Sequence, residues 1–167
     1  MTRPRRILAA AAALLLVAAL GGCAATVSMQ PAKLSNDPSC AALSVRLPKS
    51  IAGQERRYTD AQATGAWGTP ASVLLTCGIE PMGPSALPCR SLNGVDWLVD
   101  ESDAADKRYT FTTFGRTPAV QVYLDYATTG SGEALGALSP LIRDNIAATG
   151  DVCIDRPGDT PTETPAP

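Results

Sequence analysis

Apolar and polar side chains alternate along three stretches in the middle of the chain, and a fourth, residues 108–114, is rich in β-branched and aromatic residues. This period of two is typical of strands that bury one face. The predicted strands are residues 73–77, 95–99, 108–114 and 119–126. The dipeptide Asn93-Gly94 directly precedes one of them, and this pair favours a tight turn between two antiparallel strands. The pattern therefore predicts a sheet that contains at least one hairpin.

Two other stretches have the period of a helix. Residues 40–47 place Cys40, Leu43 and Leu47 on one face, and Pro48 limits the end of this helix. Asn36, Asp37 or Ser39 can cap its start. Ser139-Pro140 is typical of a second helix start, and Gly150 can end that helix. We expect an α+β fold, a mostly antiparallel sheet of about 4–5 strands with two helices packed on one face.

The chain begins with a different pattern, in which three arginines precede fourteen apolar residues, 7–20. A basic head and a short apolar stretch predict an export signal, since a membrane-spanning helix needs about 20 residues. Leu20-Gly21-Gly22-Cys23 resembles the lipobox of bacterial lipoproteins. This resemblance implies a lipid on Cys23 and a stable anchor at the extracytoplasmic face of the cell membrane. An ordinary secretory signal is the alternative, and Arg5-Arg6 leaves twin-arginine export open.

These signals divide the chain into four parts. We expect a signal peptide over residues 1–22, a lipidated tether over 23–38 and one folded domain over 39–155. Residues 156–167 are rich in Pro and Thr, which predicts a disordered tail.

Charge and composition narrow the function classes. Without residues 1–22, eleven basic and sixteen acidic residues remain, so the formal net charge is −5. This charge argues against nucleic acid or an anionic membrane surface as an electrostatic partner. The chain contains no histidine, the commonest general base and metal ligand. We expect no cofactor and no bound metal.

Four cysteines remain in the folded part, and exported proteins keep disulfides. Four cysteines allow three pairings. We predict two disulfides, Cys77–Cys89 across a proline-rich connection and Cys40–Cys153 between the two ends of the domain.

Several polar and aromatic residues are candidates for ligand or partner contact. Trp67 lies in the glycine-flanked segment GAWGTP, which predicts a loop, and it is either a ligand platform or a core residue. Trp97 alternates with apolar neighbours and is expected in the core. Asp96 and Asp100 share the opposite strand face, where they are either solvated or catalytic. Arg116 can bind an anionic group or form a structural salt bridge. Ser139 is expected to cap a helix.

Three segments, residues 66–78, 89–99 and 111–124, together with residues 40–57, resemble an actinobacterial family of small exported or membrane-anchored proteins of unknown function. The resemblance implies a location in the cell envelope and no particular activity. We expect a non-enzymatic lipoprotein that binds an envelope protein or a cell-wall component. The competing interpretation is an envelope hydrolase or transferase that uses Asp or Ser chemistry without histidine.

Overall fold

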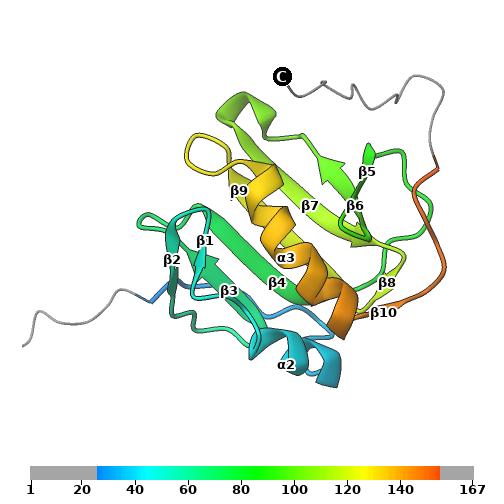
Figure 1. Ribbon diagram of the computed structural model, residues 1–167, viewed down its shortest axis with the longest axis horizontal. Helices are drawn as coiled ribbons and strands as arrows, with labels where there is room; N and C mark the ends of the chain where they lie inside the picture. Colours follow the sequence, from blue (N-terminus) through cyan, green and yellow to red (C-terminus); the bar gives the residue numbers. More distant parts are fainter. Residues whose placement is uncertain (1–25, 155–167) are drawn as a thin grey trace, which may run out of the picture.

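The structure is a computed structural model that describes residues 26–154 (Figure 1). The four predicted strands form the centre of one antiparallel sheet. The predicted signal peptide, Cys23 and residues 156–167 lie outside the described residues. The sheet has eight strands in the order β1-β2-β3-β4-β9-β7-β6-β5, and all neighbours are antiparallel. The strands are β1 (Ser50–Ile51), β2 (Gln54–Arg57), β3 (Thr64–Trp67), β4 (Val73–Ile79), β5 (Cys89–Leu92), β6 (Val95–Asp100), β7 (Arg108–Phe114) and β9 (Ala119–Asp125).

The predicted fold class is wrong in the size of this sheet, which has eight strands rather than four or five. The predicted strands are the four adjacent central ones, β4, β9, β7 and β6. The strands outside this centre lie on its two sides, where β1, β2 and β5 are short and only partly buried, whereas β3 is buried throughout. β2 has the sequence QERR, which carries no apolar alternation because its residues are exposed or only partly buried. Asn93 and Gly94 form the predicted hairpin turn between β5 and β6, with positive φ angles.

Two helices cover one face of the sheet (Figure 1). They are α2 (Pro38–Ser44) and α3 (Ser131–Asn145), and a short 3-10 helix, η2 (Ala104–Asp106), joins β6 to β7. One continuous core lies between the helices and the sheet. It contains Leu43 from α2, Leu138 and Ile142 from α3, and alternate residues of the central strands. Among residues 26–154, no helix is both long enough and apolar enough to cross a membrane.

The start of α3 differs from the prediction. The helix begins at Ser131, so Ser139 and Pro140 lie inside it, and it ends at Asn145 rather than at Gly150. Ser139 is therefore not a helix cap. Its buried hydroxyl accepts a hydrogen bond from the indole nitrogen of Trp97 at 3.2 Å. Residues 147–148 instead form β10 (Ala147–Ala148), which pairs with β8 (Arg116–Thr117).

The predicted tether is attached to the sheet over most of its length. The backbone N–H of Val27 donates to the Tyr58 carbonyl at 2.8 Å, and that of Leu34 donates to the Gly78 carbonyl at 2.9 Å. Gly78 permits this close approach, since a Cβ on it would stand 2.5 Å from the carbonyl carbon of Leu34. Residues 26–37 are therefore part of the folded unit. The sequence of this segment does not indicate this role, because it has no periodicity and its contacts are made by backbone groups.

Two disulfides are present, but the predicted pairing is wrong. Cys40 in α2 bonds to Cys77 in β4, and Cys89 in β5 bonds to Cys153 in the carboxyl-terminal segment. β4 and β5 follow each other along the chain, yet β9, β7 and β6 lie between them in the sheet. Cys77 is instead directly below α2, because its side chain faces the helix-covered side.

Candidate binding pocket on the sheet face opposite the helices

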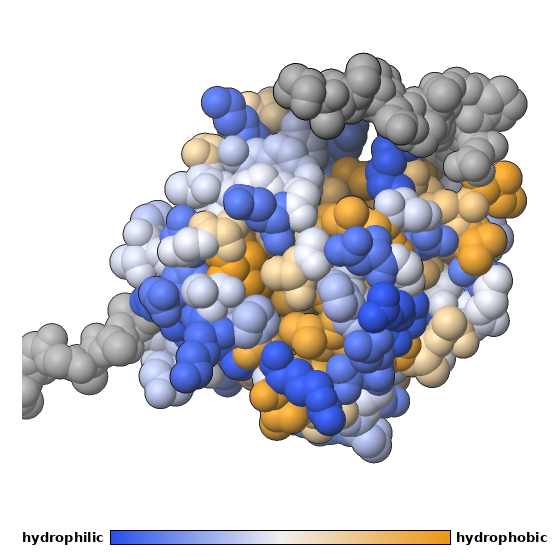
Figure 2. All heavy atoms as spheres, viewed as in Figure 1, coloured by the Kyte–Doolittle hydropathy of each residue, from blue (hydrophilic) through white to orange (hydrophobic). Residues whose placement is uncertain are grey.

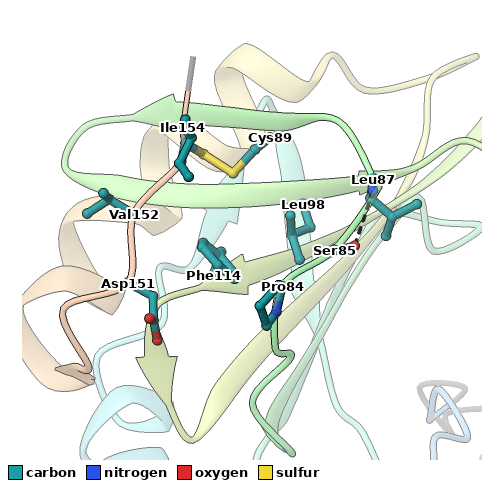
Figure 3. Close-up of a pocket in the computed structure, with 10 residues that line it drawn as sticks. Pro84, Ser85, Leu87, Cys89, Leu98, Phe114, Asp151, Val152 and Ile154 are labelled. Carbon is teal, nitrogen blue, oxygen red and sulfur yellow. Dashed lines mark hydrogen bonds between the residues drawn. A yellow bond between two sulfur atoms is a disulfide. The ribbon is translucent and has the colours of Figure 1, made fainter. Parts of the chain in front are cut away.

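The main candidate site is an apolar pocket on the sheet face that the helices leave uncovered. Its floor is formed by Leu98 of β6 and Phe114 of β7 (Figure 3). Leu98 alternates with Trp97 and Val99, whose side chains point into the helix-covered core. Leu98 points the other way and is still buried. Two irregular segments account for its burial.

These segments form the two walls of the pocket. Pro84, Ser85 and Leu87 belong to the connection between β4 and β5 and form one wall. Residues 151–154, at the carboxyl-terminal end of the described chain, form the other wall (Figure 3). The pocket encloses about 530 Å³, which is within the usual range of 300–1,000 Å³ for ligand sites. Val152 and Ile154 are 64% and 84% exposed, so the outer wall presents apolar surface to solvent.

The outer wall is held in place by one disulfide and two hydrogen bonds. Cys153 forms the disulfide with Cys89, and its backbone N–H donates to Asp96 Oδ2 at 2.7 Å. Four residues before Cys153, the N–H of Thr149 donates to the Gly115 carbonyl at 2.8 Å. The carbonyl of Asp151 comes so close to Gly115 that a Cβ there would collide with it, and Gly115 also has a φ of +66°. The pocket is thus preformed rather than assembled around a ligand.

The polar residues singled out in the sequence do not line this pocket. Asp96 accepts hydrogen bonds from the hydroxyl of Ser91 and from Cys153. Asp100 accepts one from the Ser102 N–H at 2.9 Å. This bond, together with a hydrogen bond from the Ser102 side chain, lowers the pKa of Asp100. Both carboxylates therefore stabilise the local backbone.

Arg116 is buried and binds backbone carbonyls at the end of α3. Its guanidinium donates to the carbonyls of Ile146 at 2.7 Å, Gly94 at 2.8 Å and Arg143 at 3.4 Å. Burial lowers its pKa, and the nearby Asp96 carboxylate opposes this shift. The guanidinium bonds to neutral carbonyls rather than to a carboxylate. It joins the helix end to the β5–β6 turn.

Both tryptophans lie in the core. Trp67 is 0% exposed, and its indole nitrogen donates to the Pro48 carbonyl at 3.0 Å. The predicted loop at Trp67 is strand β3, in which Gly65 leaves room for the Trp67 ring. Neither Trp67 nor Trp97 offers an exposed platform for a sugar ring.

A smaller hollow of about 380 Å³ opens on the helix side, between the start of α3 and strands β5 to β7. Tyr126 lines this hollow, and its ring meets that of Tyr109 at a tilt of 32°, with centroids 4.2 Å apart. Burial raises the pKa of the Tyr126 phenol above its ordinary value. Within residues 26–154, no three ligand-type side chains gather where they could hold a metal ion.

The profile of a family described as a protein of unknown function, DUF3515, matches residues 7–150. The chain belongs to this family. Comparisons with curated proteins and with solved structures give no match. The DUF3515 match includes most of the described residues and ends just before the outer wall of the pocket. Because the function of DUF3515 is unknown, membership of this family carries no activity over to this chain.

Sequence reasoning missed the pocket-lining residues Leu87, Leu98, Phe114, Val152 and Ile154. Two signals were present. Leu98 is an apolar residue on the otherwise acidic face of its strand, between Asp96 and Asp100. Val152 and Ile154 flank Cys153 in a segment that otherwise lacks large apolar side chains. Apolar residues beside a disulfide cysteine predict a covered surface near the cysteine's partner.

Proposed function

We propose that the chain is an envelope lipoprotein whose domain is a non-enzymatic binding module for an envelope protein. The apolar pocket between residues 84–87 and 151–154 is the single observation that carries the binding role. Its walls fit the apolar side chains of a protein partner, and Ser85 and Asp151 are the polar residues of its lining.

The envelope location has independent support. The basic head, the apolar stretch 7–20 and Cys23 in a lipobox-like context fit an exported, lipidated chain. Two disulfides also fit an oxidising compartment outside the cytoplasm. The proposed anchor then holds the domain at the membrane, close to other envelope proteins.

A protein partner is favoured over a cell-wall glycan and over an enzymatic role. Glycan sites use exposed aromatic faces and many polar groups, but both tryptophans are buried. An enzyme of the Asp or Ser type needs polar groups that converge on a hollow, whereas Asp96, Asp100 and Arg116 bond to the chain's own backbone. A mostly apolar lining with two polar residues, Ser85 and Asp151, resembles the core of a protein interface.

The test is site-specific photocrosslinking in cells. A photoreactive residue replaces Ile154 in the pocket wall, and the control carries it at Ala137, which is exposed on the other side of the domain. We expect one discrete protein adduct from position 154 and none from position 137. Val152→Asp in the same chain should abolish the adduct, because a carboxylate would be desolvated in the interface.

The location is tested with the same probe in a Cys23→Ser chain. Loss of both membrane fractionation and the adduct supports an anchored partner. A lipid or glycan adduct at position 154, or no adduct at all, contradicts the proposed protein partner.

A further inference from the structure

We infer that the sheet edge formed by β1, β2 and the residues around them faces the membrane and binds anionic lipid headgroups. This inference rests on the proposed lipid anchor at Cys23. It adds an orientation for the domain and a second contact with the bilayer. We call the residues Arg46, Lys49, Arg56 and Tyr58 the basic edge.

The first support is the short distance from the anchor to the sheet. The folded unit begins at Val27, whose N–H is bonded to the Tyr58 carbonyl and whose carbonyl accepts from the Asp60 N–H at 3.4 Å. Residues 24–26 alone separate Cys23 from Val27. Four residue steps span at most about 14 Å when fully extended. A lipid on Cys23 would therefore hold Val27 within about 14 Å of the membrane surface, and Tyr58 lies about one strand spacing, roughly 5 Å, from Val27.

The second support is the charge of the residues that this anchor brings to the membrane. The backbone N–H of Arg56 donates to the Lys49 carbonyl at 2.8 Å, which continues the antiparallel register of β1 and β2. Lys49 and Arg56 are thus opposite each other, and like charges in this arrangement repel. The Arg56 guanidinium reaches over the end of α2, to the carbonyls of Leu47 at 3.1 Å and Ser44 at 3.4 Å. Arg46, which lies between Ser44 and Leu47 in the chain, is also exposed.

The shape and exposure of this edge also fit lipid headgroups. Arg56 and Tyr58 line a hollow of about 460 Å³ together with Arg57 and Thr59. Tyr58 is 80% exposed, and tyrosine is enriched at membrane–water interfaces because its ring is apolar and its hydroxyl polar. Hydrophilic side chains gather over β2 and α2 at the lower left of the space-filling view (Figure 2). Glu55 and Asp60 are also exposed here, and the Asp60 carboxylate accepts from the Met29 N–H at 2.8 Å.

The net charge of −5 argued against an anionic surface as a partner for the whole molecule. The anchor changes this conclusion because it selects which edge meets the membrane. A basic side chain near an anionic surface increases binding by roughly fivefold. The three basic residues of the edge then increase it by roughly 100-fold.

This orientation also explains where the apolar pocket lies. Five strand spacings separate β2 from β6, which corresponds to about 24 Å across the sheet. In Figure 1 the described chain begins beside β2, on the far side of the sheet from β5 and β6. Headgroup contact at the basic edge would hold the pocket away from the bilayer, where a partner protein can reach it.

Lysine footprinting on vesicles tests the inference with the lipidated full-length protein. Lys49 lies on the basic edge, and exposed Lys107 lies in the β6–β7 connection, so the chain supplies its own control. We expect a water-soluble acylating reagent to modify Lys49 severalfold more slowly on vesicles containing phosphatidylglycerol than on phosphatidylcholine alone. The rate at Lys107 should be equal on both.

Two charge variants sharpen the test. Arg46→Glu should remove most of the protection of Lys49, whereas Arg108→Glu makes the same charge change at the start of β7 and should leave it intact. Both side chains are exposed, and unchanged circular dichroism would verify the fold. A further variant, Arg56→Gln, should weaken protection by roughly fivefold.

The outcomes separate this inference from the proposed anchor. Flotation with phosphatidylcholine vesicles reports the lipid on Cys23 regardless of charge, so a chain that does not float contradicts the anchor itself. A chain that floats but shows equal Lys49 rates on both vesicles overturns the membrane-facing edge alone. Equal protection by soluble glycerol phosphate would assign the site to a small anion and would also overturn it.

Discussion

The side-chain amide of Asn93 donates to the carbonyl oxygen of Gly136 at 3.3 Å. In a regular helix this carbonyl would accept from the backbone N–H four residues later, but that residue is Pro140, which has none. The turn between β5 and β6 therefore supplies the hydrogen bond that proline removes from α3. This contact explains how a proline is tolerated in the tenth position of the helix.

A double-mutant cycle between these positions follows from this geometry. Asn93 has a φ of +51°, so Asn93→Gly keeps the turn and removes the amide. We expect it to lower the free energy of unfolding by about 1 kcal/mol in the native chain. In a Pro140→Ala background the loss should nearly vanish, because the new N–H at position 140 can bond to Gly136. Urea denaturation of the four proteins measures the difference, and equal losses in both backgrounds would contradict the pairing.

Asp96 should stabilise the pocket wall more than its neighbour Asp100 does. Asp96 accepts from the Cys153 N–H, 57 residues away, whereas Asp100 accepts from Ser102, two residues away. Hydrogen bonds to a charged group contribute about 1.5–3 kcal/mol. We expect Asp96→Asn to lower the unfolding free energy by about 2 kcal/mol and Asp100→Asn by less than half of that. Guanidinium titration compares them, and equal effects would show that Asp96 does not hold the segment.

The disulfide pairing has a direct chemical test. Trypsin leaves Cys77 and Cys89 in one peptide, so cleavage at Met82 with cyanogen bromide is needed to separate them. We expect non-reduced fragments in which Cys40 is joined to Cys77 and Cys89 to Cys153. A Cys77–Cys89 linkage would contradict the structure.

Each disulfide closes a long loop, with sequence separations of 37 and 64 residues. Chain-entropy arguments give about 4 kcal/mol for loops of this length. We expect Cys40→Ala/Cys77→Ala to lower the unfolding free energy by about this amount or more, because both residues are fully buried. Cys89→Ala/Cys153→Ala should in addition release the outer wall of the pocket, seen as rapid proteolysis near residue 152. Equal resistance of the two variants at this site would show that the wall needs no disulfide.

The sequence predicts the centre of this fold and misses its edges, for a physical reason. Val73, Leu75, Val120 and Val122 alternate because their strands are covered on one face by helices, and this burial leaves a signal. Strand β2, with Arg56 and Arg57, is held by backbone hydrogen bonds to β1 and β3, and such bonds leave no signal in the sequence. The same limit explains the wrong cysteine pairing, which depends on the order of strands in the sheet rather than along the chain.

The candidate pocket leaves a weaker signal in the sequence than the core does, for a related reason. Its floor residues lie on central strands, but its walls are irregular segments that meet only after the sheet has formed. Residues 84–87 and 151–154 have no periodicity of their own. Their meeting depends on a disulfide and on Asp96, which looked like a solvated or catalytic carboxylate. By contrast, the strand position of Trp97 was enough to place it in the core.

Acid should release the amino-terminal segment from the sheet before the domain unfolds. The Met29 N–H and the Ser28 side chain bond to the Asp60 carboxylate and hold the pKa of Asp60 below its ordinary value of 3.8. A lowered folded-state pKa means that the stabilisation is complete above about pH 4 and is lost as the pH falls through the folded value. Hydrogen-exchange protection factors of residues 27–29 should therefore fall as the pH decreases below about 4, while those of β4 persist. Asp37, whose pKa Ser39 lowers, affects α2 in the same range and is monitored separately. Asp60→Asn should have weak protection at all pH values, and a wild-type chain with constant protection at residues 27–29 would contradict the role of Asp60.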